Sequence, residues 1–561
     1  MSSRTAGHRS VAHAAFIALI LAASLALPQP AVGADNGGEA GEAADTNGVA
    51  AEGEGPLELS LENCIALGVK QGLDYLTEEE SYILRQLATS LERHNYGRLW
   101  TSTVSAETDS ADTTTESGTV TLVKRLLTGG QLEVSGGSSS TSAGSGTADG
   151  GGDGAAGGGA PAGGEDDTYT SSLSVAIEQP LLRGAGRLVA REELTQAERE
   201  LVYAWRDLTL FKQQFVIDLV TKYYRLVQLQ LEIANQQERV TSAEDLATLT
   251  LARLATGTAS RIDMLRAVVN LLRTRNDLID ARQRYELQLD SLKLDLGLAM
   301  GRPVTIVPPA TLPYRPTLEI RLDVPEALKE SLRAMAEEAQ GAAPRVETLQ
   351  TDQAGRSVDE LGRESITAAL GSRLDLITAR DEADDARRAL RIARSNLRGD
   401  LNLTARAGYA TEPATSFEDQ RFGEPEWSVG LAYELPLDRV PERTSYRQQL
   451  IALTRAMRQT SRAQEQVLLD VRTTVRDLHR AETTVLIQQL NVVAAERRLE
   501  RARADYDLGV IANRDVVEAQ DELLQAKNAL DRAKVDHIIA TLQLEKDTGR
   551  LDPERWRELI R

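Results

Sequence analysis

The stretch Ser172–Arg187, SLSVAIEQPLLRGAGR, changes character halfway along its length. Its first half alternates apolar and small polar residues, which is typical of a β-strand. Pro180 ends that alternation because proline cannot donate a hydrogen bond to a strand ladder. Gly184 and Gly186 then allow the backbone to bend before a long segment without glycine or proline begins. The sequence therefore predicts a strand-to-helix junction at Pro180 and Gly184.

A second stretch, Ser428–Arg443 (SVGLAYELPLDRVPER), repeats this arrangement and predicts a second junction at Pro436. The segments that follow the two junctions, 187–256 and 442–508, contain neither glycine nor proline. As continuous helices, each would span on the order of 100 Å. Apolar residues recur in both at heptad spacing, and in the first segment they follow two seams, which favours a wall of packed helices over a two-stranded rod.

Each long segment ends in a turn of related sequence. Gly257 corresponds to Gly509, where glycine lets the chain reverse direction, and Asp263 corresponds to Asp515 at the same offset. Each aspartate can cap the helix that returns. Two earlier helical segments, ENCIALGVKQGLDYL and ESITAALGSRLDLI, also correspond. The chain thus contains one unit twice, made of a short helix, strands, a long helix, a turn and a return helix.

The N-terminus has charged residues, then an apolar run, then small residues, the order typical of a secretory signal peptide. A glycine-rich run within the first repeat predicts a solvated loop. Whether the neighbouring hairpin, 117–136, joins the strands stays open, so each chain supplies four or six. The expected division is signal peptide 1–34, disordered segment 35–56, first repeat 57–301 with the loop at 136–167, inter-repeat equatorial linker 302–356, second repeat 357–551 and C-terminal tail 552–561.

The strands offer one apolar and one polar face. Residues 401–409 and 427–435 alternate in this way, as the strands of a membrane β-barrel do, although a soluble β-sandwich has the same pattern. No run of 18 apolar residues follows the signal segment, so any membrane contact of the mature chain must use strands. The strands of one chain are too few to enclose an aqueous pore, which indicates that several chains share a barrel.

Composition excludes several functions. The net charge of −20 argues against nucleic-acid binding, and the five histidines are scattered without the spacing of metal ligands. The glycine-rich run lacks the flanking strand and Lys-Ser/Thr of a phosphate-binding loop. The only cysteine, Cys64, is expected to be a small buried apolar residue. We therefore expect no enzyme activity, no cofactor and no metal site.

From Leu57 to Leu551 the chain resembles the TolC-type outer-membrane efflux proteins. The doubled strand–proline–helix junction and the two Gly-x5-Asp turns are the most specific elements, and Tyr506–Gly509 (YDLG) resembles the family's second periplasmic turn. The resemblance implies a mainly α fold with membrane β, in which two structural repeats give a trimeric α-helical barrel continuous with an outer-membrane β-barrel.

The implied partners are two further copies in a homotrimer, outer-membrane lipid, a periplasmic adaptor (membrane fusion) protein and an inner-membrane pump. The implied function is the exit duct of a tripartite efflux or type I secretion system, with drugs, metals or a polypeptide as cargo. The competing hypothesis is a secreted or periplasmic coiled-coil structural or adhesin-like protein. It does not require strands before each long helix or matched helix turns.

In the family, the periplasmic helix turns form a closed gate lined by acidic and polar residues. Asp515 and Glu518 share a helix face, so threefold symmetry would stack them into acidic rings that favour cations. Simple helix capping is the alternative role for Asp263 and Asp515. An arginine expected after the second turn is Ile511 here, so the family's gate salt bridge does not carry over directly. By position, the gate and selectivity residues are Ile262, Asp263, Tyr506, Asp515 and Glu518.

Overall fold

The computed structural model describes residues 57–108, 113–143, 168–258, 260–309, 312–318, 357–508 and 510–552. The predicted signal peptide, the segment 35–56 and most of the linker, loop and tail lie outside these residues. The chain divides into two compact units. Unit 1 comprises Met1–Ala50, Arg85–Leu201 and Asp384–Arg455, and unit 2 comprises Ala51–Leu84, Val202–Ala383 and Ala456–Arg561.

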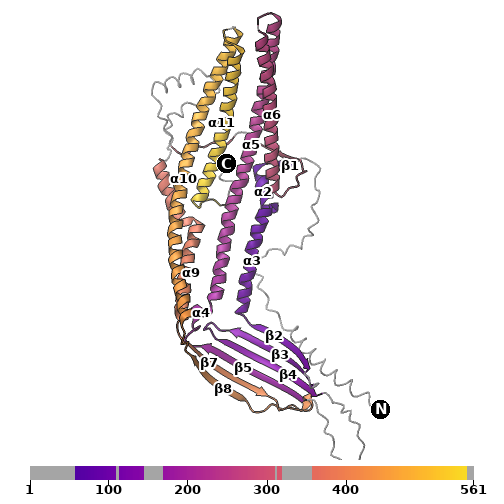
Figure 1. Ribbon diagram of the computed structural model, residues 1–561, viewed down its shortest axis with the longest axis vertical. Helices are drawn as coiled ribbons and strands as arrows, with labels where there is room; N and C mark the ends of the chain where they lie inside the picture. Colours follow the sequence, from indigo (N-terminus) through magenta and orange to yellow (C-terminus); the bar gives the residue numbers. More distant parts are fainter. Residues whose placement is uncertain are drawn as a thin grey trace, which may run out of the picture. The chain divides into compact units, whose positions relative to one another are not determined.

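Unit 1 contains one antiparallel sheet of six strands in the order β2-β3-β4-β5-β7-β8 (Figure 1). The hairpin whose place was open therefore joins the sheet as β3 and β4. The first repeat supplies four strands and the second supplies two. The strands are β2 Leu99–Thr108, β3 Thr113–Arg125, β4 Gln131–Ala143, β5 Thr168–Pro180, β7 Asp400–Ala410 and β8 Glu426–Glu434.

The prediction of a solvated loop at 136–167 is wrong for residues 136–143. Residues 136–143, which belong to the low-complexity run, continue strand β4. Small residues gain little from side-chain packing, but their backbone groups pair with β3 on one side and β5 on the other. Two pairing partners outweigh the weak intrinsic strand preference of glycine and serine.

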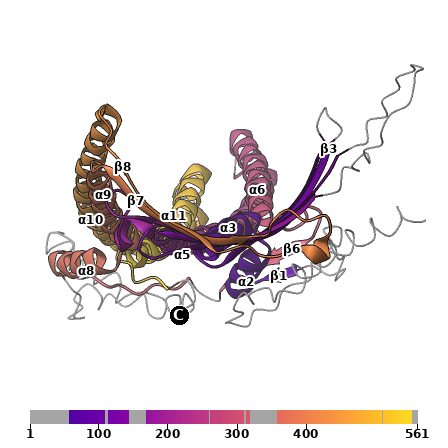
Figure 2. The same cartoon turned by 90° about the horizontal axis from the view of Figure 1, so that it is seen from below.

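The predicted alternation of the strands is confirmed by their register. One row of directly opposed residues runs through all six strands and is entirely apolar, and its last member, Trp427, is 77% exposed. The next row lies on the other face and is small or polar through β7. Figure 2 shows the sheet curving as one continuous layer. The apolar row is Trp100, Leu122, Val134, Val175, Ala407 and Trp427; the other is Thr101, Thr121, Ser135, Ser174 and Gly408.

The junction after β5 contains the predicted bend. Strand β5 ends at Pro180, and Gly184 and Gly186 have φ values of 77° and 96°, a region that favours glycine. The helix that follows is interrupted, contrary to the prediction: α4 is Arg187–Ala190 and α5 is Glu192–Ala255. The carbonyl of the intervening Arg191 accepts a hydrogen bond from the backbone N–H of Thr195, so this residue starts α5.

The second junction leads from β8 through Pro436 into α10, Val440–Asp507, which is 68 residues long. Pro441 lies in the first turn of α10, where a missing N–H removes no helical hydrogen bond. Both predicted junctions therefore join a strand to a long helix, although their turns are built differently.

Unit 2 contains two helical hairpins, α5–α6 and α10–α11, visible as paired long ribbons in Figure 1. The return helices α6 and α11 each have 35 residues and end in equivalent glycines, Gly297 and Gly549, with φ of 65° and 69°. This pair of glycines extends the predicted repeat. The remaining helices are α2 Leu61–Gln71, α3 Leu73–Asn95, α6 Arg261–Asp295, α8 Val358–Ser372, α9 Leu374–Ser395 and α11 Asn513–Asp547.

The first helical segment, ENCIALGVKQGLDYL, is not one continuous helix, and a short strand precedes it. Leu57–Leu59 forms strand β1, which pairs in parallel with β6, Val304–Ile306, at the start of the linker. Gly72 then separates α2 from α3, and a Cβ there would lie 2.4 Å from the carbonyl oxygen of Gly68. The chain therefore breaks where only glycine fits.

The core of unit 2 lies where α2, α5, α6 and α11 meet. Cys64 is fully buried there, as predicted, and burial raises the pKa of its thiol to about 12. A buried carboxylate, Glu482 on α10, fixes the described end of the linker. It accepts hydrogen bonds from the backbone N–H groups of Thr317 at 2.7 Å and Leu318 at 3.1 Å. Burial raises the pKa of Glu482, but these bonds and His537 bring it below its ordinary value.

Candidate functional site

The turn between α5 and α6 is closed by backbone hydrogen bonds. Gly257 has φ of 76°, its N–H donates to the carbonyl of Leu254, and Thr258 N–H donates to the carbonyl of Arg253 at 2.9 Å. This is the Schellman arrangement that ends a helix at glycine. Gly509 lies outside the described residues.

The turn between α10 and α11 contains a bond equivalent to one of these. Val510 N–H donates to the carbonyl of Asp505 at 2.9 Å, the counterpart of the bond between Thr258 and Arg253. The two repeats therefore end their long helices with related turns, although the residues between them are largely different.

Asp263 and Asp515 each lie in the first turn of a return helix and accept a backbone hydrogen bond. Asp263 accepts from the N–H of Ser260 at 3.3 Å and from its hydroxyl at 2.7 Å. These two bonds, the hydroxyl foremost, lower the pKa of Asp263. Asp515 accepts from the N–H of Ala512 at 3.2 Å, and its side chain is exposed. Capping is thus a real role of both aspartates, and it leaves Asp515 accessible to solvent.

Tyr506 is only 8% exposed and lies in a small cluster formed by α5, α10 and α11. The guanidinium of Arg253 on α5 lies over its ring, 4.2 Å from the centroid. Arg253 also donates to the carbonyl of Tyr506 at 3.3 Å and lies 3.5 Å from a carboxylate oxygen of Asp507. One arginine therefore ties the end of the first hairpin to the end of the second within a single chain.

The remaining predicted gate residues lie on exposed faces. Ile262 is 61% exposed in the first turn of α6. Glu518 on α11 is half-exposed, and one of its carboxylate oxygens lies 3.9 Å from the guanidinium of Arg498 on α10. Arg498 also pairs with Glu522 one turn further along α11. The structure thus brings Tyr506 and Glu518 beside arginines of neighbouring helices, and among the described residues no hydrogen bond or ion pair joins any two of the five predicted side chains.

Sequence reasoning missed Arg253 and Arg498. Both are ordinary charged positions on helices otherwise rich in arginine, and their partners are distant in sequence or on the following helix. The only local signal is that Arg253 lies in the last turn of α5, where a cation complements the helix dipole. A residue-by-residue comparison of the repeats places Asp505 at the equivalent position, so the repeat itself gives no hint of the arginine.

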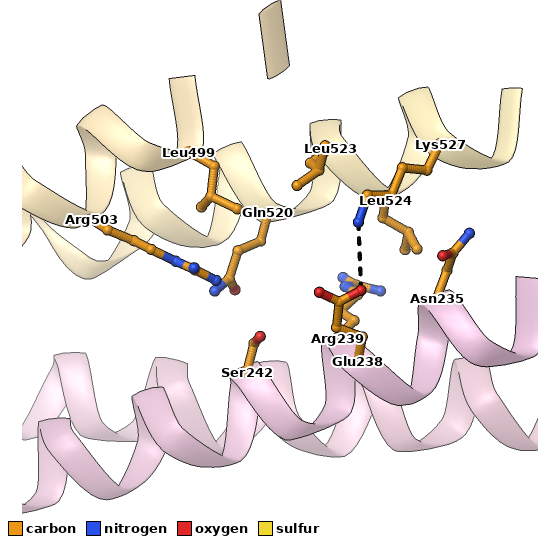
Figure 3. Close-up of a pocket in the computed structure, with 10 residues that line it drawn as sticks. All are labelled: Asn235, Glu238, Arg239, Ser242, Leu499, Arg503, Gln520, Leu523, Leu524 and Lys527. Carbon is orange, nitrogen blue, oxygen red and sulfur yellow. Dashed lines mark ion pairs between the residues drawn. The ribbon is translucent and has the colours of Figure 1, made fainter. Parts of the chain in front are cut away.

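Further from the turns, a shallow pocket separates α5 from α10 and α11 (Figure 3). Arg239, of which 10% is exposed, is one of its lining residues and pairs with Asp277 on α6 at 3.1 Å and with Asp521 on α11. Lys527 and Glu238 pair across the pocket at 3.5 Å. The lining residues are Asn235, Glu238, Arg239, Ser242, Leu499, Arg503, Gln520, Leu523, Leu524 and Lys527.

The chemistry of this region is that of charged pairs holding helices together. Across the described ranges, no group of three or more His, Cys, Asp or Glu side chains is arranged to hold a metal ion. Within the same residues, no helix combines the length and the apolar character needed to cross a bilayer. The arrangement is suited to setting how closely two helical hairpins approach each other.

A family model described as outer membrane efflux protein matches residues 131–298 and 365–550. The first segment runs from the start of β4 to the end of the first hairpin, and the second runs from α8 to the end of the second hairpin. The match thus covers most of each repeat. A curated relative, the outer membrane protein TolC of Vibrio cholerae, is 24% identical over 393 residues, which are 69% of this chain and 85% of that protein.

Two solved structures share the fold. The outer-membrane channel OprN superposes with a TM-score of 0.58 at 14% identity, covering 88% of this chain and 90% of that chain. The CmeC outer membrane channel of Campylobacter jejuni gives a TM-score of 0.57 at 12% identity, covering 89% of each chain. At such low identity the likeness concerns the fold alone, which combines long helical hairpins with a strand region.

Proposed function

The chain belongs to the outer membrane efflux protein family, and from this premise we propose that it is the exit duct of a tripartite efflux or type I secretion system. It is an outer-membrane protein that extends into the periplasm, and its family is one of channels rather than enzymes. In the proposed assembly a periplasmic adaptor and an inner-membrane pump deliver cargo to the helical end.

The observation that carries this proposal is that, in the single chain, the sheet has two open edges and helix α6 has a row of exposed apolar side chains. Strands β2 and β8 are the two edges of the sheet and each pairs on one side only among the described strands. On α6, apolar side chains at heptad spacing are each more than half exposed. Exposed edges and long apolar seams favour association. The seam consists of Ile262, Leu265, Val269, Leu272 and Ile279.

Further copies of the same chain fit these surfaces. The sheet has an even number of strands and alternates in direction, so β8 of one copy would meet β2 of the next in antiparallel orientation. Such a head-to-tail contact closes a ring when the rotation is right. We propose a homotrimer whose joined sheets form the outer-membrane barrel, with the apolar face toward lipid, and whose hairpins form the periplasmic tunnel.

The competing hypothesis of a secreted or periplasmic coiled-coil protein is not supported. A coiled-coil adhesin has no need for a six-stranded sheet with one apolar face, and the family match includes the strands β4, β5, β7 and β8. The nature of the cargo is left to the pump in this proposal.

Membrane fractionation tests the assembly. We expect the mature chain in detergent extracts of outer membranes, as a complex with three times the mass of the chain in light scattering. Crosslinking should join it to a periplasmic adaptor encoded beside a pump. A soluble monomer in the periplasmic fraction would contradict the proposed duct.

We further propose that the hairpin ends form its gate and that Asp515 and Glu518 make it cation-selective. Replacing both by alanine should reduce the cation preference of the channel in a planar bilayer, because threefold symmetry multiplies each lost charge. Reversal potentials in a salt gradient measure this preference. Glu465→Ala, which removes an exposed carboxylate from the middle of α10, is the control and should leave the preference unchanged. An unaltered reversal potential in the double variant would refute the filter.

A further inference from the structure

The strand hairpin β3–β4 has no counterpart in the second repeat. The second repeat passes from α9 through β7 and β8 to α10, whereas the first passes from α3 through β2, β3, β4 and β5 to α5. The conserved order of the repeat is thus a strand after the short helix and a strand before the long helix. The hairpin is an insertion between these two strands, and its place in the sheet decides what it does.

The insertion is bonded into the sheet along both sides. Strand β3 pairs with β2 from Thr108 to Leu99, and β4 pairs with β5 from Gln131 to Thr141. Side chains reinforce the second seam, because the hydroxyl groups of Ser135 and Ser174 lie 2.7 Å apart. A flap folded over a pore mouth would lack these continuous ladders.

The turn of the hairpin is fixed to the junction that starts the long helix. The hydroxyl of Thr128 donates to the side-chain carbonyl of Gln179 at 2.7 Å, and Gly186 N–H donates to the carbonyl of Thr128 at 3.0 Å. Arg125 pairs with Glu193 of α5 at 3.0 Å. The inserted hairpin is therefore held at the same end of the sheet at which β5 leaves for the helix.

In the half nearest its turn, the hairpin has the same two faces as its neighbours, whereas further along the apolar face gives way to small and polar residues such as Glu116 and Ser138. Leu122 and Val134 continue the apolar row of the sheet, and Val120 follows one step along β3. Apart from Ala143 and the residues nearest the turn, Val123, Arg125, Gln131 and Glu133, the other face holds threonine, serine and glycine in β3 and β4. A strand pair with one apolar and one hydroxyl-rich face suits a wall between lipid and water.

We propose that the β3–β4 hairpin is an inserted part of the barrel wall that widens the exit lumen for bulky hydrated cargo. This inference rests on the proposed trimeric duct. Three copies of six strands close a barrel of about eighteen strands, against about twelve without the hairpin, and barrel diameter grows roughly linearly with strand number. Beyond Arg125 and Glu133 near the turn, the lining added by the hairpin carries no charge, so the added width admits solutes by size rather than by charge.

Thiol labelling tests the wall without altering the strand count. In a Cys64→Ala background, Ser135→Cys and Val134→Cys are compared with Ser174→Cys and Val175→Cys, their register partners in β5. We expect a charged, membrane-impermeant thiol reagent to modify positions 135 and 174 in proteoliposomes at least tenfold faster than positions 134 and 175. If 174 and 175 alternate but 134 and 135 react equally, the hairpin is not wall and the inference is overturned. If 174 and 175 fail to alternate, the proposed duct itself fails.

Polymer exclusion tests the width. Deleting residues 113–143 removes both inserted strands and leaves β2 and β5 antiparallel, so the ring can still close. The largest neutral polyethylene glycol that enters from the extracellular side and reduces channel conductance should fall in radius by at least about a third. An unchanged size limit in a deletion variant that still forms trimers would overturn the inference. Should that variant not assemble, the labelling comparison decides.

Discussion

Replacing Arg253 by alanine is expected to open the proposed gate. The arginine stacks on the ring of Tyr506 and donates to its backbone carbonyl, so it joins the ends of the two hairpins in each chain. A partly exposed cation–π contact and one charged hydrogen bond together contribute about 1–2 kcal/mol. Their loss shifts the balance of closed and open ends about tenfold per chain, since 1.4 kcal/mol is a factor of ten.

Three chains surround the proposed gate, so the effects combine in the assembly. We expect the open probability of single channels in a planar bilayer to rise at least tenfold, with the trimer intact in light scattering. Arg501→Ala is the matched control, because Arg501 pairs only within α10, with Asp505, and bridges no hairpins. Tyr506→Phe should also leave the channel closed, since Arg253 contacts the ring and the backbone carbonyl of Tyr506, and phenylalanine keeps both. Equal open probabilities in Arg253→Ala and Arg501→Ala would contradict the proposal that Arg253 holds the hairpin ends together.

The parts of the fold that could be predicted are those with a local physical signal. The turn after α5 could be predicted from Gly257, because the backbone there has a positive φ that glycine adopts easily. The end of β5 could be predicted from Pro180, because proline has no N–H to donate to a strand ladder. Heptads mark the long helices, since their apolar side chains must face other helices. Each signal lies within a few residues of the feature that it predicts, and each occurs twice.

The parts that could not be predicted depend on partners far away in the sequence. Residues 136–143 have the composition of a loop, and only the presence of β3 and β5 on either side makes them a strand. Glu482 has the appearance of a solvated helical glutamate, yet it is fully buried under Thr317 and Leu318. The helix is likewise interrupted at Arg191 although the segment 187–256 contains no proline or glycine to mark the break. In the candidate site, the capping roles of Asp263 and Asp515 could be predicted from the sequence, whereas the contact between Arg253 and Tyr506 could not.

Replacing Arg239 by methionine is expected to lower the free energy of unfolding by on the order of 2–4 kcal/mol. Arg239 is nearly buried and pairs with Asp277 of α6 and Asp521 of α11, so it joins three helices. Removing a buried partner leaves its counterions uncompensated, and here two carboxylates, each about one-third exposed, would face each other. Denaturant unfolding of the detergent-solubilised protein, followed by helical circular dichroism, measures the loss.

Arg275→Met provides the matched control for Arg239→Met. Arg275 also joins α6 to α5, through Glu244 at 2.7 Å, but both side chains are about half exposed. Exposed pairs contribute about 0–1 kcal/mol, so this variant should unfold close to the parent midpoint. Adding Asp277→Asn and Asp521→Asn to Arg239→Met should recover much of the loss, because the cost arises from unpaired charge rather than from lost packing. If the triple variant is no more stable than Arg239→Met, the aliphatic part of Arg239 stabilises the helices by packing, and the charge clamp is refuted.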